Sequence, residues 1–92
     1  MEENKTVGKR VLLVDDDGLV RESVRLLLRK DKHTVVEANN GVEALSLFSR
    51  GQFDLVLIDF QIPFMDGSEV ATRIKHLAPR QPILMITGHG KR

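Results

Sequence analysis

Two stretches decide the fold of this chain: "VLLVDDD" at residues 11–17 and "LVLIDF" at residues 55–60. Each begins as a continuous run of Val, Leu and Ile, which is typical of a parallel strand buried on both faces. Each run ends in carboxylates, and a buried carboxylate costs desolvation free energy unless water, a cation or a chemical role offsets that cost. The two stretches therefore predict buried strands whose acidic ends reach water, hold a cation or take part in chemistry.

Helical spacing of apolar residues follows the first strand. Asp17 suits an N-cap, and Val20, Val24, Leu27 and Leu28 fall on one helical face. Further strands are predicted at 33–38, 54–59 and 83–87, with a loop at 60–67. A second helix is predicted to begin after Asn40, with Glu43 placed as in a capping box, and to end before Gly51. A third helix is predicted at 68–77, where Pro79 and Pro82 stop it. This β-α-β-α-β-α-β order predicts the α/β class, a doubly wound parallel sheet with helices on both faces.

Length and composition limit the classes of protein. The chain has 92 residues, enough for one domain, which we expect at residues 9–92 after a flexible polar segment at residues 1–8. The net charge of +1 and the absence of Trp and Tyr argue against direct nucleic-acid binding. No apolar run is long enough for a membrane span, and the N-terminus lacks a signal-peptide centre. The absence of Cys fits a reducing, cytoplasmic location.

Acidic residues follow two strands that should end at the same edge of the sheet. Because ligands bind outside the carboxyl ends of parallel strands, we expect Asp15, Asp16 and Asp59 to converge there, with Thr87 beside them. A single Asp in such a place is usually a cap or turn residue, which is the alternative for Asp15 and Asp16. Three carboxylates, however, repel one another unless a cation shares the pocket, and oxygen ligands of this kind suit Mg²⁺.

A bound Mg²⁺ with a spare carboxylate points to phosphoryl transfer. Asp59 is the best candidate nucleophile, giving an aspartyl phosphate, and the Thr87 hydroxyl could hydrogen-bond a phosphoryl oxygen. No glycine-rich phosphate-binding loop of the G-x-x-x-x-G-K-[ST] or G-x-G-x-x-G type occurs in the sequence.

Four motifs in order resemble the receiver domain of two-component response regulators: "VLLVDDD", "VVEANNGVEALSLF", "DLVLIDFQIPFMDGSEV" and "PILMITGHG". The resemblance runs from about Lys9 to Gly90. It implies a flavodoxin-like sheet with strand order 2-1-3-4, in which the family's fifth strand and last two helices are absent from the sequence given. It also implies a role as a phosphoacceptor in a phosphorelay, with a sensor histidine kinase or a histidine phosphotransfer protein as the partner.

The resemblance assigns roles to five residues of this chain. It implies that Asp59 is the phosphoacceptor and a Mg²⁺ ligand, that Asp16 binds the metal directly, and that Asp15 acts largely through water. Gln61 matches the position whose backbone carbonyl binds the metal. Thr87 matches the hydroxyl residue that senses the phosphoryl group.

The family also has a Lys at the end of a fifth strand, for which this sequence has no counterpart. Lys91 lies too close to Thr87 to be that residue by register. A receiver that lacks this Lys could act only as a protein-interaction module, without phosphorylation, and this alternative stays open. An open fourth strand also predicts either self-association through its edge or the borrowing of the missing elements from a partner, unless the chain is a piece of a longer regulator.

Two further alternatives concern enzymes and docking. A haloacid-dehalogenase type of phosphohydrolase also uses an aspartyl phosphate but needs a second acid two residues after the nucleophile, where this chain has Gln61. We therefore expect a signalling domain that is not an enzyme but could assist its own phosphorylation. Arg21, Arg25 and Arg29 are spaced as a basic stripe on the first helix, which is either a solvated face or a docking edge for the phosphodonor.

Overall fold

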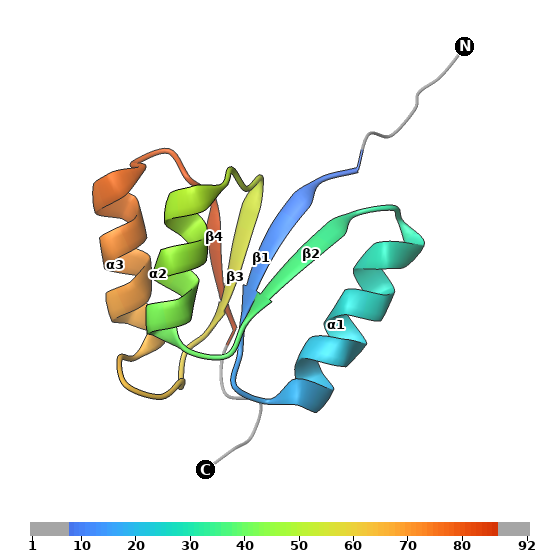
Figure 1. Cartoon of the computed structure of the whole chain (residues 1–92), viewed down its shortest axis with the longest axis horizontal. Coiled ribbons are helices and arrows are strands. Elements are labelled where there is room, and N and C mark those ends of the chain that lie inside the picture. The colour runs from blue at the N-terminus through green and yellow to red at the C-terminus, as the bar shows by residue number, and fades with distance from the viewer. Residues whose placement is uncertain (1–7, 87–92) are drawn as a thin grey trace.

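A computed structural model describes residues 8–86 of the chain. In it, four short strands pair in parallel to form one sheet (Figure 1). The elements are β1 (Arg10–Val14), α1 (Gly18–Lys30), β2 (Thr34–Ala38), α2 (Gly41–Arg50), β3 (Leu55–Asp59), α3 (Gly67–Leu77) and β4 (Ile83–Ile86). The strand order is β2-β1-β3-β4, and all three pairings are parallel. The predicted class and strand order are therefore confirmed.

The register of the three strand pairings brings the carboxyl ends of the four strands to the same edge of the sheet. Val14 pairs with both Ala38 and Ile58, and Asp59 pairs with Ile86. The ladder between β1 and β2 continues one step further, because the Asp15 N–H donates to the Ala38 carbonyl at 3.0 Å. Residues that directly follow β1 and end β3 must therefore be neighbours.

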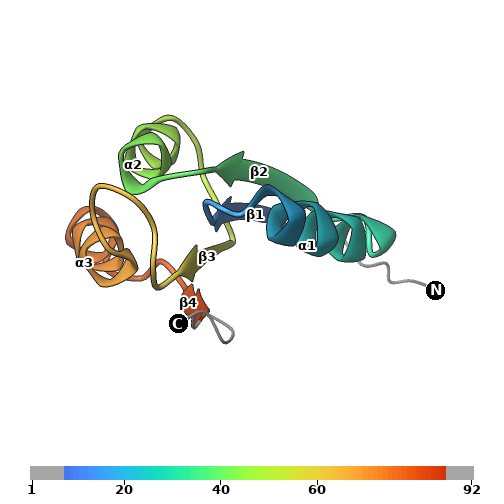
Figure 2. The same cartoon turned by 90° about the horizontal axis from the view of Figure 1, so that it is seen from below.

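The three helices divide between the two faces of the sheet. Viewed along the strands in Figure 2, α1 lies on one face, while α2 and α3 lie side by side on the other. Side chains of successive strand residues point to opposite faces, so each strand supplies both layers. This is the doubly wound arrangement that the alternating elements predict.

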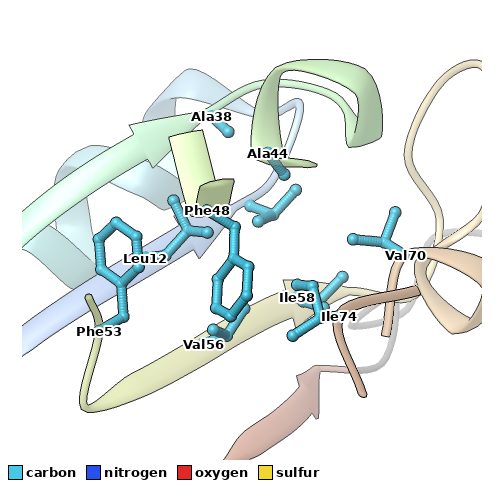
Figure 3. Packing of buried hydrophobic residues seen from close by; sticks show 10 residues of the cluster. Leu12, Ala38, Ala44, Phe48, Phe53, Val56, Ile58, Val70 and Ile74 are labelled. Atoms are coloured by element: carbon cyan, nitrogen blue, oxygen red, sulfur yellow. The ribbon is translucent and has the colours of Figure 1, made fainter. Parts of the chain in front are cut away.

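The larger core lies between the sheet and helices α2 and α3 (Figure 3). Its buried members are Leu12, Val14, Ala38, Ala44, Phe48, Phe53, Val56, Ile58, Val70 and Ile74. The rings of Phe48 and Phe53 stack with centroids 6.2 Å apart. A smaller group on the other face contains Val11, Leu13 and Leu57, packed against Val24 and Leu28 of α1. Burial of these residues on both faces explains the continuous apolar runs at residues 11–14 of β1 and 55–58 of β3.

Helix α1 buries less of its apolar face than the sequence predicts. Val24 and Leu28 pack on the sheet as expected, but Leu27 is 65 % exposed, so its predicted place on the buried face is wrong. Within residues 8–86, α1 is the one helix on its face of the sheet (Figure 2), and no neighbouring helix covers its flank. Even the side of α1 that faces the strands is therefore only partly buried.

The predicted caps form, with one change of partner. Asp17 accepts hydrogen bonds from the N–H groups of Leu19 and Val20, and Asn40 accepts one from Glu43. The Glu43 carboxylate accepts from the Asn39 N–H, at 2.9 Å, rather than from the cap residue itself as the capping-box pattern predicts. The extended backbone of Asn40 places the Asn39 N–H at the start of the helix, within reach of that carboxylate.

Some predictions fall outside the part of the chain that the structure describes. Residues 1–7 of the predicted flexible segment and the predicted strand end at Thr87 are among them. Within residues 8–86, no helix has the length and apolar content needed to cross a membrane.

Gly67 is required where α3 approaches β3. A Cβ atom at this position would lie 2.4 Å from the Asp59 carbonyl oxygen and 3.0 Å from side-chain atoms of Ile58 and Met85. The first neighbour is backbone and cannot turn away. We expect Gly67→Ala to lower the free energy of unfolding by about 1–3 kcal/mol, as overpacking does in other cores, measured by urea denaturation.

Gly18 offers a matched control for this substitution. It also lies in the first turn of a helix, but a Cβ there would meet only an Arg21 guanidinium nitrogen at 3.7 Å, an ordinary contact. Gly18→Ala should therefore leave stability unchanged or raise it by up to about 1 kcal/mol through helix propensity. Equal effects of the two substitutions would contradict the close approach of α3 to β3.

Candidate metal centre

Three carboxylates meet at the carboxyl ends of β1 and β3. Asp15 directly follows β1, Asp16 is next to it, and Asp59 is the last residue of β3. One oxygen from each carboxylate lies within 4.8 Å of those of the other two. Asp15 and Asp59 are fully buried, whereas Asp16 is exposed. The structure thus brings together three of the residues that the sequence selects.

Backbone N–H groups hold the two buried carboxylates in place. Asp15 Oδ1 accepts a hydrogen bond from the Asp17 N–H at 2.9 Å, and Asp59 Oδ1 accepts one from the Gln61 N–H at 3.2 Å. The second oxygen of Asp15 is buried and has no hydrogen-bond partner within residues 8–86. A buried carboxylate oxygen normally has a partner, so this oxygen is suited to a ligand such as a cation or its water.

The surroundings of Asp15 disfavour its charge. Burial raises the pKa of the Asp15 carboxyl above its ordinary value of 3.8, and the negative charges of Asp59, Asp16 and Asp17 raise it further. The hydrogen bond from the Asp17 N–H opposes these effects but does not cancel them. A cation among the three carboxylates would reverse this balance.

A cavity of about 570 Å³ lies beside the cluster and opens to solvent. It is lined by Asp16, Phe60, Gln61, Ile62, Pro63 and Asp66. Asp66 is the N-cap of α3, and hydrogen bonds from the Ser68 hydroxyl and the Glu69 N–H lower the pKa of its carboxyl. Gln61 therefore lies beside Asp16 at the rim, while Thr87 lies outside the described residues.

The donor set fits a hard divalent cation. It offers carboxylate oxygens alone, one of them on an exposed side chain, and an adjoining cavity with room for water. Mg²⁺ is bound in this manner, through one or two carboxylates and several retained waters. Asp15, Asp16 and Asp59 are thus the described side chains that could hold such an ion.

The sequence does not directly indicate the contacts that Arg21 makes beside this site. Arg21 of α1 donates through Nη1 to the Asp15 carbonyl at 2.6 Å and through Nε to the Glu37 carboxylate at 2.9 Å. Arg25 also faces Glu37, at 3.6 Å. The basic stripe predicted on α1 is therefore only partly solvated, because two of its three arginines form ion pairs with β2. The one feature of the sequence that could have indicated this contact is Glu37, the single charged residue of β2.

The sequence matches the response regulator receiver domain family over residues 11–92. The chain belongs to this family. It is similar to a putative transcriptional regulator of Pseudomonas aeruginosa, with 43% identity over 79 residues, which cover 85% of this chain and 38% of that protein. Among the first curated relatives that it matches, the chain spans between 9% and 38% of their length.

Solved receiver structures have the same architecture. The response regulator TrrA of Thermotoga maritima, in complex with Mg²⁺-BeF, aligns with a TM-score of 0.85 and 35% identity, covering 89% of this chain and 71% of that one. A structure of the histidine kinase ThkA in complex with TrrA aligns with a TM-score of 0.83 and 35% identity, covering 90% and 72%. The family resemblance stated from the motifs is therefore confirmed.

The charge of Asp15 should destabilise the protein in the absence of a cation. Because the folded pKa is raised, the folded state binds a proton more readily than the unfolded state, and stability falls as the pH rises from 3.8 through the folded pKa. Asp15→Asn, neutral at every pH, should therefore raise the urea midpoint at pH 7 in EDTA. The gain should shrink as the pH falls toward 3.8, where the wild-type carboxyl is protonated too.

Asp31→Asn is the control, because Asp31 is an exposed residue at the other end of α1. It should not reproduce the gain. A destabilised Asp15→Asn at pH 7 would show that the buried carboxylate is stabilised by its surroundings, contrary to this expectation.

Proposed function

We propose that this chain is a phosphoacceptor receiver in a two-component phosphorelay. In this proposal Asp59 takes a phosphoryl group from a phosphohistidine, with Mg²⁺ as the cofactor. The observation that carries the proposal is the cluster of Asp15, Asp16 and Asp59 at the ends of adjacent parallel strands. Membership of the receiver family supports it independently.

Four residues would hold the metal. Asp16 and Asp59 would bind it directly, Asp15 largely through water, and Gln61 through its backbone carbonyl. When bound, Mg²⁺ supplies positive charge that neutralises the phosphoryl oxygens and reduces their repulsion by the carboxylates. The similar Thermotoga protein was solved in complex with Mg²⁺-BeF, which supports this choice of ion.

The residues of the chain position the nucleophile and the transferred group. A carboxylate oxygen of Asp59 attacks the phosphorus; the new O–P bond forms as the P–N bond breaks, and the electron pair leaves with the donor imidazole. The Gln61 N–H orients the Asp59 carboxylate at the end of β3. We propose that Thr87 donates its hydroxyl to a phosphoryl oxygen and so senses the modification.

The partner would be a sensor histidine kinase or a histidine phosphotransfer protein. The complex of ThkA with TrrA, a protein similar to this chain, supports a kinase. The chain would accept one phosphoryl group per molecule, as a signalling domain rather than an enzyme, and could assist its own phosphorylation. Its cytoplasmic location stays a prediction.

Phosphorylation can be tested with acetyl phosphate or a phosphorylated kinase, followed by intact-protein mass spectrometry. We expect a mass increase of one phosphoryl group that requires Mg²⁺ and is lost on addition of EDTA before the donor. Asp59→Asn should abolish the adduct, because it replaces the anionic, nucleophilic carboxylate with a neutral amide, whereas Asp31→Asn should retain it.

The competing function is an interaction module that is never phosphorylated. Absence of an adduct with every donor, in a wild-type protein shown to be folded, would favour that function. An adduct that persists in Asp59→Asn would instead place the acceptor elsewhere.

One observation favours a second role, self-association through β4. This strand is at the sheet edge within the described residues, and Leu84 at its centre is 57 % exposed. Edge strands with apolar side chains tend to pair with another chain, and we propose that the partner is a second copy. Unlike phosphorylation, this role does not depend on the acidic cluster.

A charge at position 84 should weaken such an association. We expect the wild-type mass from light scattering to rise with concentration, and Leu84→Lys to shift the association to at least about tenfold higher concentration, equivalent to about 1.4 kcal/mol. Leu77→Lys, at a leucine on α3 that is 66 % exposed, is the control. A wild-type mass that stays monomeric at all concentrations would contradict the proposal.

A further inference from the structure

Arg21 connects α1, the acidic loop and β2. Its guanidinium donates through Nη1 to the Asp15 carbonyl at 2.6 Å and through Nε to Glu37 Oε1 at 2.9 Å. The side chain is only 20 % exposed, so these contacts are sheltered from water. Charge-assisted bonds of this length are among the stronger ones in proteins.

The carbonyl that Arg21 contacts belongs to the peptide unit between Asp15 and Asp16. This unit is planar, so fixing its oxygen also fixes the N–H and the Cα of Asp16. On the other side of Asp15, the N–H is held by Ala38 of β2 at 3.0 Å. Arg21 and β2 thus restrain the backbone on both sides of Asp15, and with it the direction in which the Asp16 side chain leaves the loop.

Glu37 is the carboxylate with which the Arg21 guanidinium forms its ion pair. An arginine this close to three carboxylates could pair with one of them and compete with a cation. Instead, Glu37 accepts from Nε, and the guanidinium meets the acidic loop at a carbonyl oxygen. The guanidinium therefore holds the backbone of the acidic loop at a carbonyl oxygen, while its ion pair is with Glu37.

We propose that Arg21 is a positioning residue of the metal centre. By holding the peptide between Asp15 and Asp16, it keeps the two neighbouring carboxylates in an arrangement that a divalent cation can use. This inference rests on the proposed function, because it concerns the same site. It adds a residue on α1, together with its Glu37 partner, that does not itself touch the ion.

Arg25 provides a matched control. It lies one turn further along α1 and also faces Glu37, with Nε 3.6 Å from Oε2, but no contact to the Asp15 carbonyl is found for it. Arg21→Gln and Arg25→Gln each remove one positive charge next to the same glutamate. Only Arg21→Gln removes the bond to the acidic loop.

The effect on Mg²⁺ affinity separates positioning from simple electrostatics. Loss of a positive charge near carboxylates would by Coulomb's law strengthen cation binding. If Arg21 positions the loop, Arg21→Gln should instead weaken binding, by about 10–100-fold as for other residues that orient metal ligands. Isothermal titration calorimetry with MgCl₂ measures this, at a temperature where urea denaturation shows every variant to be folded.

The control variants should behave differently. We expect Arg25→Gln to change the affinity by less than about threefold, because it leaves the carbonyl contact intact, whereas loss of a contact to a metal ligand costs more. Arg21→Lys keeps the charge but lacks the planar fork that reaches two acceptors, so it should also weaken binding. It serves as the test variant should Arg21→Gln fail to fold.

A second measurement needs no metal. The ¹⁵N order parameter of the Asp16 amide, recorded in EDTA, should fall in Arg21→Gln and not in Arg25→Gln. Mg²⁺ affinity equal to or tighter than that of the wild type in Arg21→Gln would overturn the inference and leave the proposed function standing, as would equal weakening in both glutamine variants. A wild-type protein that binds no Mg²⁺ would overturn the proposed centre, and the inference with it.

Discussion

Repulsion among carboxylates at the ends of two buried parallel strands is the constraint on which the rest of this structure depends. The register of β1 and β3 leaves Asp15 and Asp59 no freedom to separate, because Val14 and Ile58 immediately before them are paired and buried. Two of the three carboxylates are fully buried, and the surroundings raise the pKa of Asp15. A fold that maintains such a cluster sacrifices stability in the absence of a cation, which is typical of a functional site.

The helices pack against the residues that carry the acidic cluster as well as against the core. Gly67 allows the first turn of α3 to lie against the carbonyl of Asp59, and the Gly67 N–H donates to the Phe60 carbonyl at 2.9 Å. Helix α3 is thereby anchored directly to the end of β3 that carries the proposed phosphoacceptor. On the opposite face of the sheet, α1 is anchored to the other acidic loop through Arg21. A change at the cluster can therefore act on helices of both faces through direct contacts.

Local pattern predicted the elements, their order and the convergence of the acids, because these follow from periodicity and from the geometry of parallel sheets. It did not predict which side of α1 would be covered, and Leu27, which lies on the predicted apolar face, is exposed. The contact from Arg21 to Glu37 depends on how α1 lies across β2, which spacing along one helix cannot show. The sequence also does not predict the positive φ of 75° at Phe64, because aromatic residues are uncommon in the left-handed region. Tertiary packing decides each of these.

The same repulsion links the stability of the protein to the binding of a cation at the cluster. A cation that binds only the folded protein stabilises it in proportion to the logarithm of its concentration, so relief of the repulsion appears both as binding free energy and as resistance to unfolding. How much of that free energy is realised depends on how far the loop must be ordered when the ion binds, because ordering costs entropy. The Asp15 N–H donates to the Ala38 carbonyl, and Arg21 donates to the Asp15 carbonyl. Both bonds join the acidic loop to elements that pack together in the fold, so part of the cost of ordering this loop belongs to folding rather than to cation binding.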